Sequence, residues 1–139
     1  MFVNPNVRIK EILSLSVANG PVALASATNL DSGTFVAAKG NCRFVGIGVV
    51  TTLTDTKILT VQLLQATSAA GAGKKALGDA VTSTASGSVS VEAIAEADER
   101  QLDTVNSFYF VGVRISHTNG SSRDCCSLVG VVPERKPVS

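Results

Sequence analysis

Apolar and polar residues alternate along several short segments of this chain, and this period of two constrains the fold more than any other feature. Within residues 9–17, leucine and valine alternate with serine. Successive side chains of a strand point to opposite faces, so the pattern indicates a half-buried strand. The turn-forming run Asn-Gly-Pro at residues 19–21 predicts that this strand ends there.

The same period recurs between clusters of turn-forming residues. Segment 88–97 also has the alanine and glutamate content of a short helix, but the Ser-Gly-Ser run before it favours a strand. Residues 68–88 are rich in Ala, Gly, Ser and Thr, and they predict a loop with at most one short strand at 80–84. The other predicted strands are 34–38, 42–52, 57–67, 88–97, 108–117 and 125–132.

Two details refine the strand prediction. Gly46 and Gly48 lie inside the strand at 42–52, where glycine marks a bulge or a close approach of the backbone to a neighbour. Asn119-Gly120 separates the last two strands and predicts a hairpin turn, because both residue types tolerate positive φ.

About eight short strands without a convincing amphipathic helix predict an all-β fold. We expect one antiparallel β-sandwich domain over residues 1–139, with a jelly roll as one form of it. Segments 1–7, 68–88 and 133–139 are expected to be flexible and are the candidate contact segments.

Charge excludes some function classes. Twelve basic and eleven acidic residues give a net charge of +1, and no basic stripe is visible, so nucleic-acid binding is not expected. No run of 18 apolar residues and no signal-peptide pattern occur, so neither a membrane span nor secretion is predicted. Charged residues make up 17% of the chain, below the roughly 25% of average domains. This low charge favours a surface that contacts other protein.

The glycine-rich stretch after residue 67 raises the question of a phosphate-binding loop. The Walker A pattern would need glycine at 68 and a hydroxyl at 75, where the chain has Ser68 and Lys75. A dinucleotide-type GxGxx[GA] pattern at 71–76 would need a following helix, and GDAVTSTASGS is poor helix material. The stretch therefore predicts a strand connection, with Lys74 and Lys75 as solubilising charges or contacts to an acidic neighbour.

The sequence offers few candidates for catalytic or metal-binding residues. His117 is the only histidine, and its place at a strand end favours an exposed or capping side chain over a catalytic base. Cys42, Cys125 and Cys126 are predicted to be reduced and half-buried, because adjacent strand residues point apart and cannot share a metal. Their further role stays open.

An acidic group in the last third of the chain is interpreted as a solvated face with Arg100 as a local partner, rather than as paired catalytic carboxylates. An NxS pattern at 119–121 is interpreted as a turn. We therefore expect no enzyme activity, no catalytic, cofactor-binding or metal-binding residues, and no small-molecule substrate. The acidic residues are Glu92, Glu96, Asp98, Glu99 and Asp103.

The order of four segments resembles a known class of proteins. KILTVQLLQATSAAGAGKKALG, VEAIAEADERQLD, FYFVGVRISHTNG and CSLVGVVPERKPV follow one another between residues 55 and 138. Together they resemble small β-rich virion proteins found beside major capsid proteins in tailed bacteriophages. The pair Cys125-Cys126 and the run Pro133-Glu134-Arg135 depart from the plainer strand and tail of that class.

This resemblance implies a capsid decoration, cement or minor capsid protein that binds the major capsid protein and forms a homo-oligomer. It implies assembly in the cytoplasm of a host bacterium and a place in the virion. A tail or head-to-tail connector component is the alternative within virion proteins. A carbohydrate-binding module and a hydrolase using His117 are alternatives from other classes, although the chain has no Trp and one Tyr to form a sugar platform.

Overall fold

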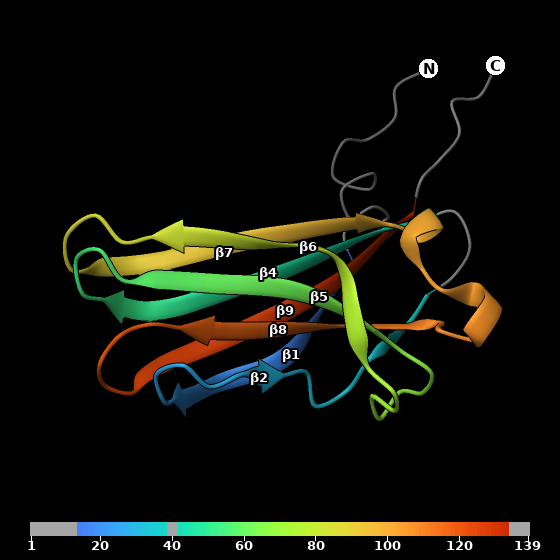
Figure 1. Cartoon of the computed structure of the whole chain (residues 1–139), viewed down its shortest axis with the longest axis horizontal. Helices are drawn as coiled ribbons and strands as arrows, with labels where there is room; N and C mark the ends of the chain where they lie inside the picture. Colours follow the sequence, from blue (N-terminus) through green and yellow to red (C-terminus); the bar gives the residue numbers. More distant parts are fainter. Residues whose placement is uncertain (1–13, 39–41, 134–139) are drawn as a thin grey trace, which may run out of the picture.

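The computed structural model describes residues 14–38 and 42–133, and it is a sandwich of two antiparallel sheets (Figure 1). Sheet A has the strand order β1-β9-β4-β7, and sheet B has the order β2-β8-β5-β6, with β3 also paired to β8. The predicted all-β sandwich is confirmed. The strands are β1 (Ser14–Leu24), β2 (Leu30–Asp31), β3 (Val36–Ala37), β4 (Cys42–Leu53), β5 (Ile58–Ala66), β6 (Lys75–Thr84), β7 (Val89–Asp98), β8 (Phe110–His117) and β9 (Arg123–Pro133).

Strands that follow one another in the chain mostly belong to opposite sheets. Only β2–β3 and β5–β6 stay within one sheet, and β1 lies beside β9 although the two strands are at opposite ends of the described chain. This interleaved order is that of a jelly roll. Two short 3-10 helices, η1 (Glu99–Gln101) and η2 (Thr104–Asn106), lie between β7 and β8 at one end of the sandwich (Figure 1). No helix among the described residues is long and apolar enough to cross a membrane.

Three local predictions are wrong. β1 continues to Leu24 past Gly20 and Pro21, because it is an edge strand and irregular register after Val17 accommodates the proline. Segment 68–88 contains the ten-residue strand β6. Asn119-Gly120 does not close a hairpin, since β8 belongs to sheet B and β9 to sheet A.

The two sheets contribute side chains of different size to the core. Sheet B supplies large apolar side chains from its inner face. Sheet A supplies mostly small ones at its centre, and Phe44 and Leu53 fill the two ends of β4. The large residues of sheet B are Leu59, Val61, Leu63, Leu77, Val111, Val113 and Ile115, and the small residues of sheet A are Gly46, Gly48, Ala93, Ala95, Ala97 and Ser127.

Gly46 and Gly48 are places of close approach between the layers, as their positions inside a strand predict. A Cβ at Gly46 would lie 2.9 Å from Leu63 Cδ2. A Cβ at Gly48 would lie 2.6 Å from Val61 Cγ2 and 2.7 Å from Ile115 Cγ2. Side chains of sheet B therefore occupy the space that larger residues on β4 would need.

Replacing Gly48 by alanine tests this packing. We expect Gly48→Ala to lower the free energy of unfolding by about 1–3 kcal/mol, because the added methyl group overpacks a closed core. Chemical denaturation followed by far-UV circular dichroism measures the change. Gly120→Ala is the matched control, since nothing lies within 4 Å of its added Cβ, and equal stability of both variants would contradict the packing.

Candidate interaction surface

The glycine-rich turn before β6 covers a small second core on the outer side of sheet B. Phe35 is 2% exposed and packs with Leu64 and Ala66 in this cluster. A Cβ at Gly71 would lie 2.9 Å from the Phe35 ring, and Gly71 has φ of +85°, a region that favours glycine. The amide of Phe35 also donates to Ala69 O at 2.8 Å. The glycines therefore admit an aromatic ring beneath the turn, and the predicted strand connection is confirmed.

The two lysines of this turn have partners within the chain. Lys74 Nζ lies 2.8 Å from Asp31 Oδ2, and Lys75 Nζ lies 2.6 Å from Asp103 Oδ2. Lys75 also lies 4.2 Å from the centroid of the Phe108 ring. Both lysines contact acidic residues of their own chain, which a phosphate-binding role would require them to leave.

Asp31 joins three segments on the outer side of sheet B. Its carboxylate accepts hydrogen bonds from Arg114 Nε at 2.6 Å and Arg114 Nη2 at 3.0 Å, in addition to the contact with Lys74. The Arg114 guanidinium and the Lys74 ammonium hold the pKa of Asp31 below its ordinary value, although partial burial acts in the opposite direction. This ion-pair group fixes β2 and the turn before β6 to β8.

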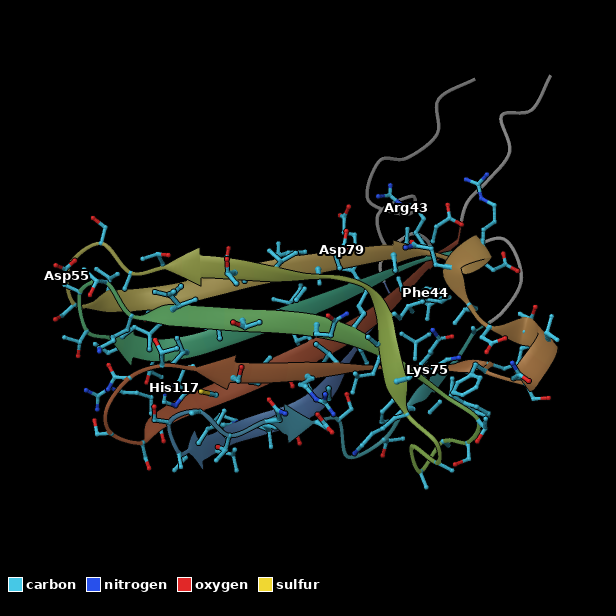
Figure 2. The ribbon with its side chains drawn as sticks, in the orientation of Figure 1. Arg43, Phe44, Asp55, Lys75, Asp79 and His117 are labelled. Atoms are coloured by element: carbon cyan, nitrogen blue, oxygen red, sulfur yellow. The ribbon has the colours of Figure 1, made fainter. Side chains whose placement is uncertain are left out.

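His117 is buried rather than exposed. Figure 2 shows it towards the end of the sandwich that carries Asp55. Its Nε2 lies 2.7 Å from Leu24 O, and its Nδ1 accepts the Asn119 amide at 3.1 Å. Of the two expected alternatives, an exposed or a capping side chain, the structure shows the capping one. Both ring nitrogens bind the backbone, so neither is available as a base for a substrate.

The acidic group separates into local pairs. Glu96 accepts from Arg43 at 2.9 Å, and Asp98 binds Arg100, whose hydrogen bonds lower the pKa of the Asp98 carboxyl. Arg43, Glu96 and Asp98 line a shallow cleft of about 430 Å³ together with Ala97 and Gln101. Asp103 lies apart from these residues. Its hydrogen bond with Lys75 lowers the pKa of its carboxyl most, and its hydrogen bond with Asn106 lowers it further. No group of three metal-binding side chains occurs in the described part of the chain.

A set of large residues of sheet A points away from the core, and sequence reasoning missed this surface. On β4, Val45, Ile47 and Val49 are partly exposed while the glycines between them are buried. Glycine at every second position of an apolar strand was the available signal, because it implies that the other face carries the larger side chains. The apolar residues of the outer face of sheet A are Val17, Val45, Ile47, Val49, Ile94, Cys126, Leu128 and Val132.

A second apolar surface is the loop 103–109, termed the Val105 loop. Val105 is 92% exposed and Tyr109 is 47% exposed. Asp103 accepts hydrogen bonds from the Asn106 amide at 3.3 Å and from Asn106 Nδ2 at 2.8 Å, and Tyr109 Oη donates to Thr104 O at 3.3 Å. These bonds hold the loop in one shape, and nothing in the sequence pattern pointed to it.

Of the three segments predicted to make contacts, the structure describes 68–88 and residue 133. Segment 1–7 and residues 134–139 lie outside the described residues. Segment 68–88 supplies β6 and the turn over Phe35.

Cys125 is buried and Cys126 is partly exposed, as adjacent strand residues should be, and the side chain of Cys42 lies outside the described set.

Comparisons with known proteins show the fold. No protein-family model matches the chain, and no curated protein does. The exported protein XepA of PBSX superposes with a TM-score of 0.57 at 11% identity, over 91% of this chain and 39% of XepA. A chain of the T13 particle of infectious bursal disease virus superposes with a TM-score of 0.52 at 10% identity, over 87% of this chain and 31% of that chain. This chain thus spans less than half of either structure.

The two adjacent cysteines should differ in reactivity. Burial raises the pKa of the Cys125 thiol to about 11, so at pH 8 it is protonated and inaccessible. At protein concentrations low enough to keep single copies, we expect iodoacetamide to modify Cys126 in the folded protein and to reach Cys125 only after denaturation. Peptide mass spectrometry measures this, with Cys126→Ser as the control, and equal labelling of both thiols in the native chain would contradict the assigned faces.

Stability in acid should depend on Asp31. Its folded pKa lies below its unfolded value, so its stabilising contribution is present above the unfolded pKa, near 3.8, and is lost as pH falls through the folded pKa. We expect Asp31→Asn to be less stable than the native chain at pH 7, and the difference to shrink as pH falls below the unfolded pKa of 3.8. Denaturation midpoints from pH 2 to 7 measure this. A constant difference over that range would contradict the ion-pair account.

Proposed function

We propose that this chain is a structural protein of a tailed-phage virion, a capsid decoration protein that binds the major capsid protein and stabilises the shell. The observation that carries the proposal is the distribution of apolar side chains. A jelly roll with a closed core exposes a further set of large apolar residues on sheet A and at the Val105 loop. Contiguous exposed apolar surface marks sites of contact with other molecules.

The chemistry of the described residues supports a binding role over catalysis. The histidine is occupied by the backbone, and the acidic residues are dispersed among local ion pairs. Jelly rolls serve viral capsids, lectins and metal-binding cupins. A cupin site needs several histidines, and the chain has one. The fold likeness to a phage protein, XepA of PBSX, and to a chain of a viral particle supports the viral alternative.

The Val105 loop is the surface we assign to the major capsid protein. Its hydrogen bonds order it before binding, so little conformational entropy is lost on contact. Val105 belongs to η2, which lies at one end of the sandwich (Figure 1), and its side chain is almost fully exposed. Such a tip fits a pocket or a seam between subunits of a shell. The virion is accordingly the proposed location, with assembly in the bacterial host.

Two other functions are consistent with parts of this surface. A tail or head-to-tail connector component would use the same contacts, and electron microscopy of particles carrying the labelled protein separates a ring from a coat spread over the head. A carbohydrate-binding module is less favoured, because Tyr109 is the one strongly exposed aromatic side chain among the described residues.

Binding to shells tests the proposal. Empty heads assembled from the major capsid protein of the same phage are mixed with the purified protein and sedimented. We expect co-sedimentation, and Val105→Asp should weaken it at least about tenfold, because a buried unpaired charge costs more than 1.4 kcal/mol. Thr82→Asp is the control, since it places the same charge on an exposed position of β6. Absence of co-sedimentation of the native chain would contradict the proposal.

A further inference from the structure

An apolar row crosses the whole outer face of sheet A. Val17 on β1 pairs with Leu128 on β9, Leu128 pairs with Ile47 on β4, and Ile47 pairs with Ile94 on β7. The two ends of the row are the most open, with Val17 68% and Ile94 46% exposed. The remaining apolar residues of this face flank the row on β4 and β9. Exposure to water of a four-strand apolar face without a charge at its centre is unfavourable.

The outer faces of sheets A and B differ in how far the described chain covers them. On sheet B, Phe35 and the turn before β6 cover Leu64 and Ala66, and Arg114 is paired with Asp31. On sheet A, no described segment covers the corresponding face. The described chain therefore completes one side of the sandwich and leaves the more apolar side open.

We propose that the outer face of sheet A packs against the same face of a second copy of this chain. Strands about 4.8 Å apart and outward positions about 6.7 Å apart give a face of about 600 Å² for four strands and five positions. Two such faces bury about 1,200 Å², the lower end of the range for specific interfaces. A pair of identical faces also forms a closed dimer, in which no part of this apolar face is left free for further growth.

The charges of β7 select one of the two ways in which the faces can meet. Glu92, Glu96 and Asp98 all lie on the outer side of β7, where Arg43 and Arg100 offset two of the three charges and leave an acidic excess. The opposite edge of the sheet, β1, carries no acidic residue in its described part. A two-fold axis across the strands would place β7 over β7 and bring like charges together. An axis along the strands places β7 over β1 of the partner. Ile94 of one copy then faces Val17 of the other, and Ile47 faces Leu128.

The second copy is the partner of the outer face of sheet A, one of the two surfaces on which the proposed function rests. The dimer does not require binding to a capsid shell. Self-association is measured on the purified chain alone, whereas the proposed function is measured by binding to heads. A chain that dimerises but ignores heads would retain the inference and remove the proposed function. A chain that binds heads as a single copy would do the reverse.

Disulfide trapping tests the arrangement. Val17→Cys and Ile94→Cys are prepared separately in a Cys126→Ser background and oxidised alone and as a mixture. Two thiols bridge only when their Cβ atoms are about 4 Å apart, so we expect a covalent dimer in the mixture and none in either variant alone. Isotope labelling of one variant identifies the mixed product by mass. A link within the Ile94→Cys sample alone, or none in the mixture, overturns the proposal.

Sedimentation velocity supplies the second measurement. We expect the native chain to sediment as two copies at micromolar concentration and Ile94→Asp as one, while Thr82→Asp stays dimeric. Ile94 is partly exposed on an edge strand, so the variant should fold, and its melting curve verifies this. If residues 1–13 of the same chain or an unrelated protein covers the face instead, the native chain sediments as one copy at all concentrations, which overturns the proposal.

Discussion

The close approach of the two sheets at β4 is the constraint on which the rest of the structure depends. Gly46 and Gly48 leave space that Val61, Leu63 and Ile115 of sheet B occupy. The core is therefore filled mainly from one side. Because alternate residues of a strand point to opposite faces, the residues that flank these glycines, Val45, Ile47 and Val49, are directed outward. A closed core and an apolar outer surface are two consequences of one sequence pattern.

Polar groups are arranged around this frame rather than gathered into a reactive centre. Ion pairs attach the loops to the strands, with Asp31 on sheet B and Asp103 below the Val105 loop as the main anchors. The histidine holds the end of β8 to the end of β1 through the backbone. Labelled charged residues such as Arg43 and Lys75 lie near the end that carries η1 and η2, while Asp55 lies at the opposite end (Figure 2).

The sequence predicts the layers of this fold better than its connections or its surfaces. Alternation placed most of the longer strands correctly, since burial of one face imposes a period of two regardless of topology. The hairpin predicted at Asn119-Gly120 was wrong, because a turn signal indicates that the chain changes direction but not which sheet the next strand joins. Contacts of Lys74 and Lys75 to acidic residues were one of two interpretations, and the sequence could not name Asp31 and Asp103, which are distant along the chain. The outer face of sheet A required knowledge of which face of β4 meets the core.

The most direct test is the solvent accessibility of methyl groups measured by NMR with a soluble paramagnetic agent over a range of protein concentrations. The account predicts that the methyl groups of Ile47 and Leu128 are accessible in dilute solution and become protected as the concentration rises. Leu63 should be protected throughout, and Val105 should be accessible throughout. Protection of Ile47 and Leu128 at every concentration, or accessibility at every concentration, would contradict the outward face and its proposed partner.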